Sequence, residues 1–298
     1  MAIPSSGAYL GVWQPGVPTN LSSLDSFESA AGKHMAIVMF WRDWASDSGS
    51  INPSWLSAIA ARGSVPMITW SPANWSNGTD NANYTLANIT GGMFDSYIRQ
   101  TADILRNYGG PVLLRTMHEM NGTWYTHWSG NPSAYVAAWK HIHDIFSQEG
   151  ATNVQWVWCP NTFWSGSLAT DPAGYYPGSS YVDWVGLDGY NRSDWGYMSF
   201  TKIFGYAVSH EAAFGKPIMI AETASGEFGD GGVKKSQWIT DTFNTAIPSM
   251  PAIKAVLWFD EDKSISENCP CQWPVASTST AQSAFSAAAA SPYYVGGR

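Results

Sequence analysis

The chain has 298 residues, of which 45 % are hydrophobic and 13 % charged, with a net charge of −8. Its 15 Lys and Arg form no basic cluster, which argues against a nucleic-acid partner or an anionic membrane surface and favours a neutral substrate. No run of about 18 apolar residues predicts a membrane span. The length fits either two ordinary domains or one α/β barrel, so the order of the elements must decide.

Eight short apolar segments, bounded by turn residues, are predicted as β-strands. Stretches with helical spacing lie between most of them, such as Phe94, Tyr97, Ile98 and Leu105 before the fourth strand. Tyr135, Ala138, Trp139, Ile142 and Phe146 repeat that spacing after it. The alternation predicts a (β/α)8 barrel, with strands at Tyr9–Trp13, Met35–Trp41, Val65–Ser71, Val112–His118, Val154–Cys159, Val182–Asp188, Ile218–Glu222 and Ile253–Asp260.

A doubly wound sheet would show the same nearly continuous apolar strands, so closure of the barrel needs further support. The number of strands supports it, and so do the polar and aromatic residues at the strand ends, which a barrel gathers around one site. No linker divides residues 1–298, so one catalytic domain is expected, and Ala281–Ala290 is predicted to form its closing helix. The strand-end residues are Trp13, Trp41, Trp70, His118, Glu119, Asp188, Tyr190, Glu222, Trp258 and Asp260.

Two glutamates, Glu119 and Glu222, close the fourth and seventh predicted strands, so in a barrel they would face each other across the site. Hydrolysis of a glycosidic bond requires one protonated carboxyl for the leaving oxygen and a second, ionised carboxylate. Met117, Met120 and Trp124 surround Glu119 in the sequence and predict a raised pKa. The pair therefore indicates a glycosidase with Glu119 as acid/base.

The other carboxylate has a cation and a hydroxyl as candidate partners. Arg115 shares the inward side of its strand by the period of two, and a buried arginine needs an anion. Together with Tyr190 it is expected to keep Glu222 ionised, which makes Glu222 the nucleophile. Asp188 is an alternative partner of Arg115, and both pairings can hold together. Arg115 is also expected among the substrate-binding residues.

Three segments carry a family resemblance: Arg115–Trp124 (RTMHEMNGTW), Gly186–Tyr190 (GLDGY) and Ala221–Ser225 (AETAS). Together they resemble glycoside hydrolase family 26, retaining enzymes of the large (β/α)8 barrel clan, over nearly the whole chain. The resemblance implies the same catalytic roles for the two glutamates. It also implies that His118 contacts the sugar next to the cleavage point, Tyr190 hydrogen-bonds the nucleophile, Trp124 shapes the leaving-group side and Trp258 forms a stacking floor.

The substrate implied by the resemblance is a neutral β-linked polysaccharide, cut internally. Family members that cut β-mannan commonly carry a His at the end of the third strand, where this chain has Ser71. This departure leaves β-1,4-mannan and β-1,3/1,4-glucan open, with β-1,3-xylan as a further family substrate. The 17 Trp fit a sugar cleft, because their flat faces pack on sugar rings, although core packing is the alternative for each.

Two other functions fit part of the sequence. A noncatalytic glycan-binding barrel is the alternative, but the intact glutamate pair argues against it; a structural or interaction protein would explain the aromatic excess and not the pair. The sequence His118-Glu119 resembles the start of a zinc-binding helix, yet no second His follows, so neither metal nor cofactor is expected.

The remaining expectations concern the cysteines and the setting of the chain. Cys269 and Cys271 could form a tight local disulfide, Cys159 is left over, and all three are interpreted as structural. We expect a secreted monomer, with the signal segment absent from this chain.

Overall fold

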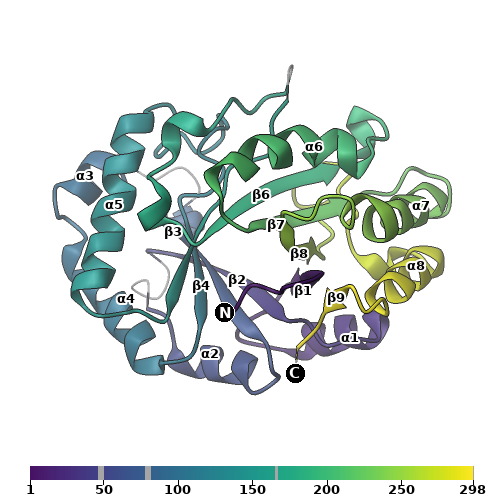
Figure 1. Ribbon diagram of the computed structural model, residues 1–298, viewed down its shortest axis with the longest axis horizontal. Helices are drawn as coiled ribbons and strands as arrows, with labels where there is room; N and C mark the ends of the chain where they lie inside the picture. Colours follow the sequence, from purple (N-terminus) through teal and green to yellow (C-terminus); the bar gives the residue numbers. More distant parts are fainter. Residues whose placement is uncertain (46–49, 78–81, 165–166, 298) are drawn as a thin grey trace.

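The computed structural model describes residues 1–45, 50–77, 82–164 and 167–297. Parallel strands β1 to β8 follow one another around a barrel, and β1 pairs with both β2 and β8, which closes it. The predicted (β/α)8 fold is confirmed (Figure 1). The strands are β1 Ala8–Trp13, β2 Ile37–Asp43, β3 Val65–Ser71, β4 Val112–Thr116, β5 Val154–Trp158, β6 Trp184–Asn191, β7 Ile218–Ser225 and β8 Ile253–Phe259.

Two of the differences from the predicted strands concern the two glutamates. β4 ends at Thr116, so Glu119 lies beyond the strand instead of closing it. β7 continues to Ser225, so Glu222 lies within a strand. A ninth strand, β9 (Tyr294–Val295), pairs with β1 and was not predicted from the sequence.

Helices surround the barrel (Figure 1). Local signals set their ends: Asn131 caps α5 by accepting a hydrogen bond from the Ala134 amide at 3.2 Å, and Gly109 ends α4 in the left-handed conformation. The α-helices are α1 Ser22–Ala31, α2 Pro53–Ala60, α3 Leu86–Thr90, α4 Asp95–Tyr108, α5 Pro132–Gln148, α6 Phe200–Glu211, α7 Val233–Asp241 and α8 Ser279–Ala289. Shorter 3-10 turns and a π-helical turn, Thr242–Ala246, also occur.

All five residues named for α5 are buried, and of the four named before β4, Ile98 and Leu105 are buried while Phe94 and Tyr97 are partly buried. Ten of the 17 Trp are buried in the core, so core packing accounts for most of the tryptophan excess. Within the described parts of the chain, no helix is long and apolar enough to cross a membrane. Cys269 and Cys271 form the local disulfide, and Cys159 is a buried thiol.

Candidate active site

A cleft of about 770 Å³ lies at the carboxyl ends of the strands, where a barrel of this kind forms its site. Both Glu119 and Glu222 line it, as the strand pattern predicts. Four tryptophans in its wall keep some exposure: Trp41, Trp124, Trp164 and Trp195. The cleft thus combines two carboxyl groups with flat apolar faces, a combination suited to sugar rings.

Arg115 lies inside the barrel and joins two carboxylates. Its Nη1 donates to both Asp188 carboxylate oxygens, at 3.0 and 2.8 Å, while its Nη2 donates to Glu222 Oε1. Its Nε donates to Thr69 Oγ1 at 2.9 Å. Burial opposes the charge of Arg115, but the two carboxylates beside it raise its pKa well above the usual value. Both predicted pairings of Arg115 therefore hold together.

The second oxygen of Glu222 accepts a hydrogen bond from the Tyr190 hydroxyl, as the resemblance implies. The Tyr190 ring stacks on Trp273, with ring centroids 4.2 Å apart and planes within 10°. Trp273 is itself buried, so it fixes the Tyr190 ring from behind. Each oxygen of Glu222 thus has its own donor, which fixes the orientation of the carboxylate.

Glu119 lies in an unusual turn after β4. Met117 and Glu119 have φ values of 44° and 54°, a left-handed region that costs a residue with a Cβ about 1–3 kcal/mol. Surrounding donors hold this turn, because the Met117 carbonyl accepts from the Tyr135 hydroxyl at 3.2 Å and the His118 carbonyl from Trp128 Nε1 at 2.9 Å. The Glu119 amide donates to the Cys159 carbonyl at 2.7 Å. The backbone is therefore held in the conformation that turns Glu119 into the cleft.

The Glu119 carboxyl accepts hydrogen bonds from two neutral groups. Asn161 Nδ2 donates to Oε1 at 2.7 Å, and Trp124 Nε1 donates to Oε2 at 2.5 Å. Burial raises the pKa of Glu119 to about 7, with a further contribution from the charge of Glu222, although both hydrogen bonds oppose the increase. The increase agrees in direction with the prediction, but Trp124, one of the neighbours from which it was predicted, lowers the pKa through its hydrogen bond. Glu119 can hold a proton near neutral pH.

His118 lines the cleft, although it is almost fully buried. Its Nε2 lies 3.1 Å from the Tyr125 hydroxyl, and its ring packs edge-on against Trp41. Burial lowers the pKa of His118 well below its usual value, helped by the positive charge of Arg115. The imidazole is therefore neutral, and its contact with a sugar stays a prediction.

Two of the residues predicted to bind substrate do not reach the cleft. Trp258 is fully buried behind β8, where its ring packs against Trp238 of α7 and Phe285 of α8. Side chains alternate along a strand, so the neighbouring Phe259 is the one that contacts Tyr190, at a centroid distance of 5.9 Å. The predicted stacking floor at Trp258 is wrong. Arg115 is also fully buried and acts through Glu222 instead of binding sugar directly.

Several cleft residues were missed by the sequence analysis as functional residues. Trp41 was noted only as a strand end, and no motif marked Tyr125 or Trp273. Asn161, which contacts the acid/base carboxyl, lies in the loop after β5, two residues past Cys159. Its position directly after a barrel strand was the available signal, because such loops build the active site. Trp124 lines the cleft and is 42 % exposed, and its place on the leaving-group side stays a prediction.

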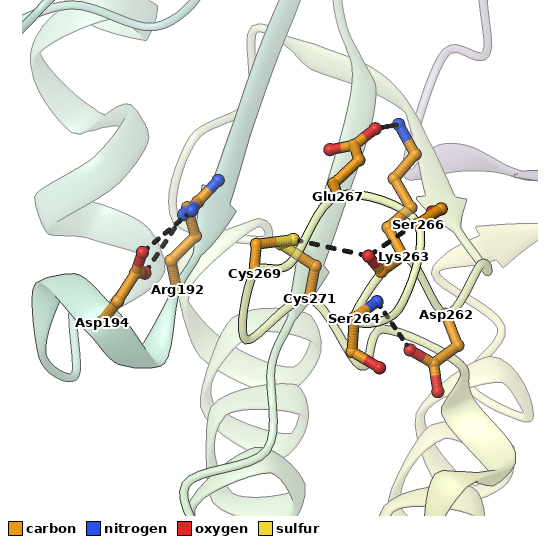
Figure 2. Close-up of a disulfide and its surroundings, with 9 residues drawn as sticks. All are labelled: Arg192, Asp194, Asp262, Lys263, Ser264, Ser266, Glu267, Cys269 and Cys271. Carbon is orange, nitrogen blue, oxygen red and sulfur yellow. Dashed lines mark hydrogen bonds and ion pairs between the residues drawn. A yellow bond between two sulfur atoms is a disulfide. The ribbon is translucent and has the colours of Figure 1, made fainter.

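The loop between β8 and α8 forms one rim of the cleft. Figure 2 shows the Cys269–Cys271 disulfide with Lys263 and Glu267, whose side chains form an ion pair of 2.9 Å. The Arg192–Asp194 pair, 2.9 Å apart, lies on the neighbouring loop after β6. Lys263, Glu267 and Arg192 all line the cleft, so its charged rim is balanced by ion pairs.

Residues 37–247, more than half of the chain, match the profile of glycosyl hydrolase family 26. Endoglucanase H of Acetivibrio thermocellus is 37 % identical over 87 % of this chain and 28 % of its own length. A mannan endo-1,4-beta-mannosidase of Bacillus subtilis is 26 % identical over 70 % of this chain and 64 % of its own length. The chain therefore spans less than two thirds of either relative.

Solved structures show the same fold at lower identity. A modular endo-beta-1,4-mannanase from Cellulomonas fimi, described as a glycoside hydrolase family 26 member, superposes with a TM-score of 0.72 and 18 % identity. The superposition covers 98 % of this chain and 72 % of that one. Together with the profile match, these likenesses agree with the motifs around both glutamates: the chain belongs to glycosyl hydrolase family 26.

Proposed function

We propose that this chain is a retaining endo-β-glycosidase that hydrolyses a neutral β-linked polysaccharide by double displacement. The observation that carries the proposal is the unlike pair of carboxyl groups in one cleft. Glu119 has a pKa raised to about 7 and two neutral donors, whereas Glu222 is bonded to the Arg115 guanidinium and the Tyr190 hydroxyl. One group is suited to hold a proton and the other to remain a carboxylate.

In the first step, the Glu222 carboxylate attacks the anomeric carbon and forms a glycosyl ester. Glu119 gives its proton to the departing glycosidic oxygen, so the leaving sugar departs as a neutral alcohol. Arg115 and Tyr190 each donate to a different oxygen of the carboxylate. Each oxygen therefore keeps a second lone pair, which can attack the anomeric carbon.

In the second step, Glu119 takes a proton from a water molecule, which attacks the glycosyl ester and restores Glu222. Formation of the ester removes the negative charge of Glu222, which is one of the causes of the raised Glu119 pKa. The pKa of Glu119 is therefore expected to fall in the intermediate, which favours the carboxylate form needed for a base.

For the sugar, β-1,3/1,4-glucan is the first candidate and β-1,4-mannan the second. Ser71 is fully buried and lies outside the cleft lining, so the third strand supplies no polar contact where mannan-cutting relatives commonly carry a His. The relative named an endoglucanase also shows higher identity over more of this chain than the mannosidase does. Mannan remains the second candidate because the mannosidase and the solved mannanase share the family fold.

The test is incubation of the purified protein with mixed-linkage β-glucan, β-mannan, galactomannan and β-1,3-xylan, with product sizes followed over time. We expect short and intermediate oligomers from the glucan, and none from the same protein carrying Glu222→Ala. A single small product would overturn endo action. Binding without cleavage on every glycan would overturn the enzymatic proposal and favour a glycan-binding module.

We also propose that the protein works outside the cell as a monomer. The Cys269–Cys271 disulfide supports this location, because disulfides persist mainly in oxidising compartments. A polymeric substrate would also be met there. Cell fractionation and light scattering test the two statements; a cytoplasmic protein or a stable dimer would contradict them.

A further inference from the structure

Two asparagines connect the loop after β4 to the loop after β5. Asn121, only 3 % exposed, uses both ends of its side chain on the backbone of Asn161. Its Oδ1 accepts from the Asn161 amide at 2.9 Å, and its Nδ2 donates to the Asn161 carbonyl at 2.9 Å. Nδ2 also donates to the Thr170 carbonyl at 2.8 Å. The amide group of Asn121 thus binds both the N–H and the carbonyl of Asn161.

A second neighbour holds Asn161 from the opposite direction. Asn161 forms a parallel bridge with Asp188 of β6, in which the Thr162 amide donates to the Asp188 carbonyl at 2.8 Å. The backbone from which the Asn161 side chain projects is therefore fixed by β6 on one side and by Asn121 on the other. That side chain reaches Glu119 Oε1 at 2.7 Å.

The two oxygens of the Glu119 carboxyl are held differently. Oε1 has Asn161 as its donor, and this donor is fixed to the barrel backbone. Oε2 has Trp124, whose side chain is 42 % exposed and stands in the cleft wall. Because the donor to Oε2 stands in the cleft wall and the donor to Oε1 is fixed to the backbone, we infer that Oε2 is the oxygen that meets a leaving group or water.

Building on the hydrolysis proposed above, we propose that Asn161 is a positioning residue for Glu119 and that Asn121 acts by holding Asn161. The Asn161 amide group fixes the rotation of the carboxyl, so that Oε2 exchanges the proton with leaving group and water. Its N–H also stabilises the carboxylate, which is the form that activates water in the second step. This role explains why Asn121 belongs to the motif around Glu119 although it does not touch the cleft.

Other groups near Glu119 also influence its protonation, and these stay in place when either asparagine is replaced. The negative charge of Glu222 raises the Glu119 pKa and the positive charge of Arg115 lowers it. Loss of the Asn161 donor removes a stabiliser of the carboxylate without adding a charge, so the pKa must increase. The further titratable groups that interact with Glu119 are Tyr125 of the loop after β4, and Asp188 and Tyr190 of β6.

The experiment compares Asn161→Ala and Asn121→Ala with the wild-type protein and with Asn153→Ala. Asn153 is a matched control, because its Nδ2 also donates to two backbone carbonyls, those of Leu105 and Gly110. These contacts lie at the amino ends of β4 and β5, away from the cleft. The first readout is the NMR titration of the ¹³C-labelled Glu119 carboxyl, assigned with Glu119→Gln. The second is the pH dependence of kcat/KM on the best glycan.

We expect Asn161→Ala to move the Glu119 titration and the alkaline limb of kcat/KM upward together, by about one pH unit. Asn121→Ala should move both in the same direction by less, and Asn153→Ala should move neither. Unchanged titrations in both Asn161→Ala and Asn121→Ala, or equal shifts in all three variants, would overturn the positioning role. Asn161→Ser replaces Asn161→Ala if the latter does not fold, as judged by thermal unfolding.

The two readouts separate this inference from the proposed function. If the wild-type protein hydrolyses no glycan, the proposed function fails, but the NMR titration still decides whether Asn161 and Asn121 control Glu119. If hydrolysis occurs and the titration does not move, only the positioning role fails.

Discussion

Glu222 lies within strand β7, beside a register shift in its pairing with β6 and β8, whereas Glu119 lies three residues beyond the end of β4, in a turn with left-handed backbone. Glu222 has a charged donor in Arg115, whereas the side-chain donors to Glu119 among the described residues are the neutral Asn161 and Trp124. A cation beside a buried carboxylate favours its charge, but neutral donors compensate only part of the cost of burial. The hydrogen-bond donors around each glutamate, and not the residue type, therefore decide which one acts as acid/base and which as nucleophile.

The backbone contributes to the same division. Glu222 is paired with Asp188 in the ladder between β6 and β7, next to a register shift, and this backbone pairing contributes to its position. Glu119 depends instead on single side-chain donors, such as Tyr135 to the Met117 carbonyl and Trp128 to the His118 carbonyl. The surroundings of Glu119 should therefore be the more sensitive to single substitutions that leave the barrel intact.

The largest effect is expected from removal of either carboxyl group. Glu222→Ala should lower kcat by about 10³-fold or more, because no group remains to form the glycosyl ester. Added azide should then attack from the vacated side and give a glycosyl azide of inverted configuration. With Glu119→Ala and an activated aryl glycoside, azide should instead attack the glycosyl ester and give the retained product.

NMR of the two azide products checks the assignment. The opposite pattern, with retention from Glu222→Ala, would exchange the two roles. Failure of both variants to lose activity would show that the reaction occurs without this pair.

The second-largest effect is expected from loss of Arg115, the cation that Asp188 and Glu222 share. Arg115→Met leaves the carboxylates of Asp188 and Glu222 buried without a positive partner, which is expected to cost about 3–5 kcal/mol of unfolding free energy. Urea unfolding measures it. Arg99→Met is the control, since the Arg99–Glu149 pair is partly exposed and should contribute less than about 1 kcal/mol. Equal losses in the two variants would contradict the role of Arg115.

The pH dependence of kcat/KM tests whether Glu119 is the acid. Glu119 must be protonated for the first step, and its pKa is raised to about 7, so kcat/KM should fall about tenfold per pH unit above roughly that pH. The loss must occur on the alkaline side, because deprotonation removes the acid. Initial rates between pH 5 and 9 measure it. A kcat/KM that stays constant to pH 9 would contradict the assignment of Glu119 as the acid.

Much of the fold and the core of the site could be predicted from the sequence. The eight apolar strands and the spacing of α4 and α5 are local patterns, and a closed barrel is the arrangement that gathers their ends. The strand count also placed Glu119 and Glu222 in one cleft, and the need of a buried Arg115 for an anion predicted its partners.

The rest depends on contacts that no local pattern encodes. Trp258 lies in the predicted eighth strand but its side chain points outward, and an error of one residue reverses the side, as Phe259 shows. Asn161 reaches Glu119 only because the loops after β4 and β5 are neighbours in the barrel. The left-handed turn at Met117 and Glu119 was not predictable, because both residue types disfavour that backbone and distant donors stabilise it.

The smallest expected effect concerns the donor to Glu119 Oε2. A Cβ on Gly122 would lie 2.4 Å from the Trp124 ring, so Gly122→Ala must displace the indole and break its hydrogen bond to Glu119. We expect KM to increase roughly 2–10-fold, as loss of one hydrogen bond of about 1 kcal/mol implies, and the alkaline limb of kcat/KM to move slightly upward.

Two further variants show whether the change comes from the lost hydrogen bond of Trp124. Trp124→Phe keeps an aromatic ring without the N–H, so it should reproduce the change of the alkaline limb with a smaller change in KM. Gly174→Ala is the control, because its Cβ would meet only Pro132 at an ordinary 3.5 Å. If Gly122→Ala and Trp124→Phe both keep the wild-type KM and alkaline limb, Trp124 shapes the cleft without influencing the acid. The asymmetry between the two Glu119 oxygens would then depend on Asn161 alone.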